Sequence, residues 1–180
     1  DLLKAYKLSV VPDIAPNKFE TGTQSLEGQA GVIGAIEYFQ WLGSTIGAQF
    51  LSTEGVSQRT AEIRAGLSAM VAHEQVLAER LIAGLEAIPD LCVRGITDRS
   101  RFDHRVPTVS FTHPKVSPAD VATYLDTKGV YVWDGHSYAL PVVQFLGIEE
   151  SGGVVRLGPT HYNTLDEVDT VVGHIAEFIA

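Results

Sequence analysis

Cysteine is almost missing from this chain of 180 residues, since Cys92 is the only one. A single thiol cannot form an internal disulfide, so the fold must depend on a packed core, and we expect a cytoplasmic, reducing environment. Long apolar runs are missing too. No segment approaches the roughly 20 apolar residues that a membrane-spanning helix needs, so we expect no membrane partner.

The sequence also lacks clustered positive charge. Acidic residues outnumber lysine and arginine by 22 to 13, and the formal net charge is −9. This balance argues against a nucleic-acid partner. The histidines show no metal-binding spacing: His73-Glu74 begins a zinc-protease motif, but Leu77 stands where its second histidine is required. We expect no metal site.

The first half of the chain predicts an arm followed by two helices. Pro12 and Pro16 prevent a continuous N-terminal helix, so we expect an extended arm that is strand-like at Leu8–Val11. A helix over Ser25–Leu42 carries three glycines, which favours close packing there. A long helix over Val56–Ile88 has one apolar stripe, interrupted at Glu74. The three glycines are Gly28, Gly31 and Gly34.

The second half predicts short strands and helices in alternation. Alternating or apolar segments predict strands at Leu91–Arg94, Val106–Thr112 and Val130–Trp133, with Cys92 as a small buried hydrophobe. Helices are expected from Ser117 to Gly129 and over Ala139–Leu146. We therefore predict an α+β fold, in which helices cover one face of a small, mostly antiparallel sheet.

The stretch from Gly153 to Asp169 predicts a strand, a turn and a helix. Val155 and Leu157 alternate with Arg156, so the guanidinium should project away from the core at the strand end. Gly158-Pro159 stops the strand, and Thr164 with Glu167 forms a capping box. By these criteria alone, Arg156 is more typical of a structural ion-pair partner than of an anion-binding residue.

The same stretch resembles the C-terminal signature of the class V aminotransferases, a pyridoxal 5′-phosphate (PLP) family that includes cysteine desulfurases. The resemblance implies that Arg156 binds the carboxylate of an amino-acid substrate. A second match, Phe19-Glu20-Thr21-Gly22-Thr23, implies a homodimer in which Gly22 and Thr23 reach the cofactor phosphate of the partner subunit. Its spacing alone is more typical of a threonine that caps the following helix.

A third match lies in the segment 135–141. Gly135, His136, Ala139 and Pro141 resemble the desulfurase loop that carries the sulfur-accepting cysteine, but Tyr138 occupies the position of that cysteine. The resemblance implies that His136 and Tyr138 belong to an active site, without the sulfur chemistry. The segment is also close to the nucleophile elbow of serine hydrolases, which leaves a second interpretation. That alternative combines Gly135-His136-Ser137 with Asp166 or Asp169 and with His174.

The resemblance does not extend to a lysine that could hold the cofactor. The family binds PLP covalently on a lysine that follows a histidine, and none of the five lysines has that context. The resemblance, which leaves out this lysine, therefore implies that residues 1–180 are a single C-terminal domain of a fold type I PLP enzyme.

Within that domain, residues 1–55 would form the arm and a helix returning to an absent large domain, and residues 56–180 the small α+β domain. The full enzyme would act on an amino acid by epimerase, lyase or transaminase chemistry, and this chain alone would be inactive. The other interpretation is a non-catalytic dimerisation or regulatory domain.

Overall fold

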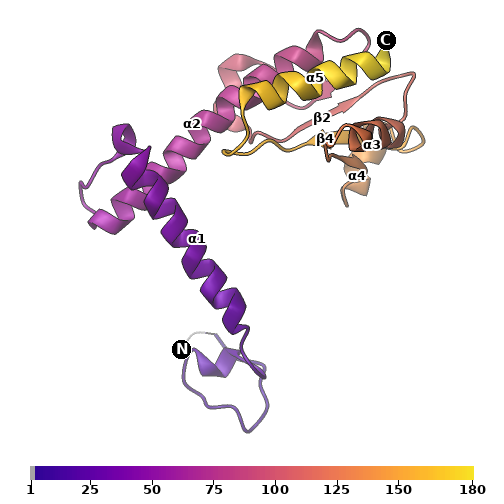
Figure 1. Cartoon of the computed structure of the whole chain (residues 1–180). Coiled ribbons are helices and arrows are strands. Elements are labelled where there is room, and N and C mark those ends of the chain that lie inside the picture. The colour runs from indigo at the N-terminus through magenta and orange to yellow at the C-terminus, as the bar shows by residue number, and fades with distance from the viewer. Residues whose placement is uncertain (1–2) are drawn as a thin grey trace. The chain divides into compact units, whose positions relative to one another are not determined.

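The computed structural model describes residues 3–180 (Figure 1). The chain divides into two compact units, 1–66 and 67–180, and each is described by itself. Helices and strands follow one another as predicted: two helices, two strands, and then helix and strand in alternation up to a final helix. Within the described residues, none of the helices combines the length and apolarity required to cross a bilayer.

The N-terminal unit begins with a series of turns. The strand predicted at Leu8–Val11 is wrong, because the backbone N–H of Val11 donates to the carbonyl of Leu8 at 3.1 Å and closes a turn instead. A short 3₁₀ helix, η1 (Asn17–Phe19), follows, and α1 then spans Leu26–Thr45.

Close packing in this unit occurs at different glycines from those predicted. Helix α1 meets the start of α2 (Gln58–Glu86), where a Cβ on Gly43 would overlap the carbonyl of Glu62 and one on Gly66 would overlap the carbonyl of Phe39. Among the described residues, Gly31 and Gly34 have nothing within 4 Å of such a Cβ, and Gly28 meets only Ser25 of its own helix turn. The expected packing at these three glycines is therefore wrong for this chain. The short helix η2 (Ala48–Phe50) connects the two long helices.

The C-terminal unit contains a four-stranded antiparallel sheet in the order β1-β2-β4-β3. The strands are β1 (Cys92–Arg94), β2 (Val109–Thr112), β3 (Trp133–Gly135) and β4 (Val154–Leu157). Strand β4, which carries Arg156, lies between β2 and β3, so Arg156 has a neighbouring strand on each side.

Two strands are displaced or shortened relative to the prediction. Strand β2 begins at Val109 rather than Val106, because the Arg105 side chain donates to the carbonyls of Val106 and Thr108. The predicted strand at 130–133 is wrong for its first three residues. Its partner β4 ends before Gly158-Pro159, and proline has no N–H with which to extend the pairing.

Helices α2, α3 (Pro118–Thr127) and α5 (Leu165–Ile179) share one core with the sheet. Figure 1 shows α5 alongside the second half of α2, next to β2 and β4. Burying each large apolar side chain in such a core contributes roughly 1.5–3 kcal/mol. Most of the buried residues come from these helices and from the inward positions of β2 and β4, among them Leu77, Leu81, Leu85, Val109, Phe111, Val121, Leu125, Val155, Leu157, Val168 and Ile175. This arrangement confirms the predicted α+β fold with helices on one face.

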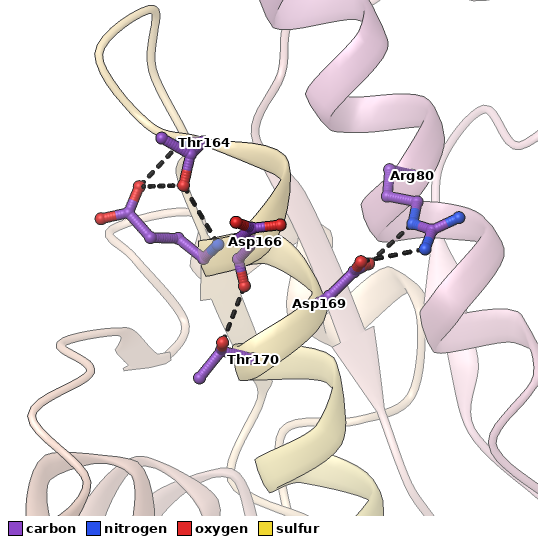
Figure 2. Close-up of polar contacts among 6 residues, drawn as sticks. Arg80, Thr164, Asp166, Asp169 and Thr170 are labelled. Carbon is purple, nitrogen blue, oxygen red and sulfur yellow. Dashed lines mark hydrogen bonds and ion pairs between the residues drawn. The ribbon is translucent and has the colours of Figure 1, made fainter.

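Polar contacts fix both the start and the orientation of α5 (Figure 2). The predicted capping box is present, since the Glu167 N–H donates to the Thr164 hydroxyl while the Thr164 N–H donates to the Glu167 carboxylate. That backbone donor, with the Thr164 hydroxyl and the Asn163 amide, holds the pKa of Glu167 below its usual value. One turn later, Arg80 of α2 donates to both carboxylate oxygens of Asp169, at 2.6 and 2.9 Å.

The Arg80–Asp169 pair should make a small, acid-sensitive contribution to stability. Hydrogen bonds from Arg80 lower the pKa of Asp169 below its usual value of about 3.9. A lowered folded-state pKa stabilises the fold above the unfolded-state pKa, and the effect is lost as the pH falls through the folded-state value. Asp169→Asn should therefore lower the melting temperature at neutral pH, and its difference from the parent should shrink below about pH 4.

Thermal melts by circular dichroism across this range would measure that difference. Glu150→Gln is the control, because among the described residues the exposed Glu150 side chain has no hydrogen bond or ion pair. A difference in melting temperature between Asp169→Asn and the parent that stays constant below about pH 4 would contradict the stabilising role of the Arg80–Asp169 pair.

Candidate functional site

Arg156 projects from β4 on the face of the sheet opposite the core. Its neighbours Val155 and Leu157 are buried, whereas Arg156 is exposed, as the alternation predicted. Ser110 of β2 and Trp133 of β3 stand directly opposite Arg156 on its two sides. Side chains that face one another in an antiparallel pair project to the same face. Arg156 therefore lies between a hydroxyl and an indole on a face that the helical core does not occupy.

Within residues 3–180, the Arg156 guanidinium has no hydrogen bond or ion pair. An arginine kept for structure would be expected to pair with a carboxylate, as Arg80 does with Asp169. A free guanidinium offers a planar fork of donors that matches a carboxylate. The observed environment favours the anion-binding interpretation of Arg156.

The sheet register extends this row of side chains to β1. Arg94 pairs with Ser110, so Arg94, Ser110, Arg156 and Trp133 cross all four strands in sequence. The Arg94 guanidinium donates to the Thr112 hydroxyl at 2.8 and 3.0 Å. The sequence reasoning missed Ser110, Trp133 and Arg94 as neighbours of Arg156, because only strand pairing brings them together.

His136 and Tyr138 follow β3 on a short turn. The side chain of Tyr138 is 93% exposed, and its ring meets the His136 ring edge-on, with the centroids 6.2 Å apart. Gly135 pairs with Val154 in the register that also pairs Trp133 with Arg156. The turn that carries His136 and Tyr138 therefore leaves the sheet from the strand next to Arg156.

The turn after β4 is held by two adjacent residues of α2. The Glu74 carboxylate accepts the backbone N–H of His161 at 3.1 Å and lies 3.7 Å from its ring nitrogen. The His73 ring contacts the carbonyl of Asn163 at 2.9 Å. These contacts explain why Glu74 interrupts the apolar stripe: it satisfies the backbone of the segment that joins β4 to α5.

Gly22 and Thr23 belong to the N-terminal unit. Gly22 has a positive φ of 75°, which glycine adopts at little cost, and Thr23 is exposed. The cap position of α1 is Ser25, not Thr23. The helix-capping interpretation of Thr23 therefore does not hold, and its predicted contact with a partner subunit's phosphate stays a prediction.

The serine-hydrolase interpretation finds no support in the geometry. Ser137 has its hydroxyl buried and without a partner among the described residues, whereas a nucleophile must be reachable. Asp169 is bound by Arg80, and His174 lies 3.7 Å from Glu177. The four strands are also antiparallel, unlike the parallel sheet that supports a nucleophile elbow.

Cys92 is exposed, which corrects the prediction that it is buried. It lies on the edge strand β1, opposite Thr112, on the face that carries Arg156. The sequence could not show this, because a three-residue strand gives no clear alternation.

A cavity of about 530 Å³ lies between the segments 129–132 and 157–163 and the start of α5. It opens where β3 and β4 stop pairing, and neither Arg156, His136 nor Tyr138 lines it. Among residues 3–180, no group of three or more histidine, cysteine, aspartate or glutamate side chains could hold a metal ion.

Comparison with known proteins places the chain in a family. The model of the aminotransferase class-V family matches residues 56–171, so the chain belongs to that family. It is 30% identical over 179 residues to a probable cysteine desulfurase of Pyrococcus abyssi, covering 98% of this chain and 36% of that protein. A cysteine desulfurase of Escherichia coli is 28% identical, with 88% of this chain and 31% of that protein covered.

Among solved structures, the apo cysteine desulfurase of Thermococcus onnurineus NA1 superimposes with a TM-score of 0.68 and 27% identity. The match covers 94% of this chain and 37% of that one. The chain thus spans about a third of the length of the relatives it matches. This chain shares the fold of the part of that structure which it matches.

Gly153 sets how closely β3 approaches β4 beside the candidate site. It has a positive φ of 85°, and a Cβ there would overlap the carbonyl of Gly135. Gly153→Ala should therefore destabilise the C-terminal unit by more than about 1 kcal/mol, because both the conformation and the space are wrong for alanine. Gly173→Ala should instead stabilise by about 0.5–1 kcal/mol, since Gly173 is exposed in a helix with nothing within 4 Å.

Chemical denaturation of the two variants and the parent would measure these opposite effects. Equal stabilities for the two glycine variants would show that β3 does not approach β4 at Gly153 as described.

Proposed function

We propose that this chain is the C-terminal part of a PLP-dependent enzyme of the class V family that acts on an amino acid. The observation that supports the proposal is the environment of Arg156. Its guanidinium is unpaired and lies on an open face of the sheet. The chain belongs to the family, and Arg156 occupies the position of the carboxylate-binding arginine in the family motif. Its planar donors would orient a substrate carboxylate through two hydrogen bonds. Trp133 would shield that ion pair from water on one side.

The lysines of this chain do not fit the covalent attachment of PLP. Lys7, Lys115 and Lys128 form ion pairs with acidic residues, and Lys18 contacts the carbonyl of Leu3. Lys4 is exposed in the N-terminal arm. We therefore propose that this chain alone is inactive and that a further part of the enzyme anchors the cofactor. The contribution of this chain would be Thr23, beside the conformationally free Gly22, at the phosphate of a homodimer partner.

The turn beside β3 would supply hydrogen-bond donors close to the bound substrate. The phenol of Tyr138 and the ring of His136 are both exposed there. The phenol suits proton transfer or hydrogen bonding in an epimerase, lyase or transaminase, and the His136 ring suits hydrogen bonding.

The relatives named above are cysteine desulfurases or probable ones, yet we propose that the complete enzyme does not release sulfur through a protein persulfide. A phenol with a pKa of about 10 is a poor substitute for a thiolate at Tyr138. Cys92 lies on β1, at the opposite edge of the sheet from β3. Three strand spacings correspond to roughly 14 Å, too far for Cys92 to act at the loop.

Sulfide release from L-cysteine by the complete enzyme is the corresponding measurement. We expect no release that depends on Cys92. Robust sulfide formation that Cys92→Ser abolishes would overturn this part of the proposal.

Replacing Arg156 by lysine tests the proposed carboxylate site. Arg156→Lys keeps the charge but loses the planar fork, so the affinity of the complete enzyme for its amino acid should fall by about 1.5–3 kcal/mol. This loss is roughly a ten- to hundredfold increase in the dissociation constant. The melting temperature should hardly change, because Arg156 has no partner among residues 3–180.

Arg64→Lys is a matched control, since Arg64 is an exposed helical arginine in the N-terminal unit. Lower stability of Arg156→Lys with unchanged substrate affinity would show that Arg156 is a structural residue.

A further inference from the structure

The turn His136–Ala139 has an unusual backbone for the residues it contains. Ser137 and Tyr138 have φ values of 48° and 60°, and the N–H of Ala139 donates to the carbonyl of His136 at 2.7 Å. Two successive positive φ values with this hydrogen bond define a type I′ turn. That turn normally carries Asn-Gly, because a side chain disfavours the left-handed conformation. Something must therefore hold Ser137 and Tyr138 in it.

The His136 ring supplies such a contact. The backbone N–H of Tyr138 donates to Nδ1 of His136 at 3.1 Å. A ring nitrogen that accepts a hydrogen bond carries no proton, so the neutral ring must have its proton on Nε2. Asparagine and aspartate stabilise turns in the same way, by accepting the N–H two residues further on. His136 takes their place here.

The turn also determines where Tyr138 points. The phenol is 93% exposed, and within the described residues its hydroxyl has no hydrogen-bond partner. The hydroxyl of the neighbouring Ser137 is buried instead. Apart from the edge-on contact with the His136 ring, the Tyr138 ring has no ring contact or hydrogen bond among residues 3–180. The left-handed backbone at Tyr138 is therefore the main feature that directs the phenol outward.

We propose that His136 is a positioning residue: its neutral ring, protonated on Nε2, holds the type I′ turn and thereby directs the Tyr138 phenol. Nδ1 is occupied by the backbone, so His136 presents an Nε2–H donor to its surroundings and no basic nitrogen. The inference rests on the proposed function only where it gives the turn a role in catalysis. The geometry itself is a property of this chain.

The tautomer of His136 can be measured directly in the parent chain. Long-range ¹H–¹⁵N correlation spectra of the labelled chain distinguish the protonated from the unprotonated ring nitrogen. We expect the Nε2–H form for His136, together with the strong amide–Hα contact within Tyr138 that a left-handed residue produces. Protonation of Nδ1 in the neutral ring would overturn the proposal, whether or not any variant folds.

Two variants of His136 separate positioning from general packing. His136→Asn places an acceptor oxygen where Nδ1 lies and should keep the left-handed signature of Tyr138. His136→Leu fills similar space without an acceptor and should lose it. Retention of the signature in His136→Leu, or its loss in His136→Asn when that variant is folded, would contradict the proposal.

His113 provides an internal control. Its Nδ1 accepts the N–H of Lys115 at 3.3 Å, the same two-residue relationship, but Lys115 does not have a positive φ. His113→Leu should leave the signals of Tyr138 unchanged, and a change equal to that of His136→Leu would count against a specific role. None of these spectra depends on Arg156. The proposal for the His136 turn can therefore be refuted while the proposal for carboxylate binding by Arg156 holds, and carboxylate binding can be refuted while the turn proposal holds.

Discussion

The register of β4 between β2 and β3 is the constraint on which the candidate site depends. It buries Val155 and Leu157 against the helices and turns Arg156 to the opposite face, between Ser110 and Trp133. A shift of one residue would bury the guanidinium and expose the two apolar side chains, at a large cost in free energy. The core thus specifies the register, and the register specifies the position of Arg156.

Both ends of β4 are held by specific contacts. Before the strand, Gly153 permits the close approach to Gly135. After it, Glu74 of α2 binds the backbone of the following turn. The turn beside β3 has its own support in His136. Arg156 and Tyr138 are therefore exposed side chains without hydrogen-bond partners among residues 3–180, and the backbone segments that carry them are fixed. A preorganised binding site requires such a combination.

Much of this fold could be predicted because it rests on local signals. The capping box at Thr164 and the periodicities of the helices fix the order of the elements. The errors arise where side-chain or tertiary contacts determine the local structure. The Arg105 side chain binds carbonyls that would otherwise have extended β2. Helix α1 packs against α2 at Gly43 and Gly66, not at the three predicted glycines. For the candidate site, the motifs predicted roles for Arg156, His136 and Tyr138, and these roles stay predictions. The strand pairing was required to predict the row of side chains from Arg94 to Trp133 and the exposure of Cys92, and no local sequence pattern contains that pairing.

Carboxylate binding by the complete enzyme is the most direct test of the role proposed for Arg156. The side-chain N–H signals of arginine, followed by nuclear magnetic resonance during titration with a simple L-amino acid such as alanine, report on each guanidinium separately. We expect a saturable change at Arg156 and none at the exposed helical Arg64. Equal, non-saturating changes at both arginines, or no change at Arg156, would contradict the claim that Arg156 is a carboxylate-binding residue.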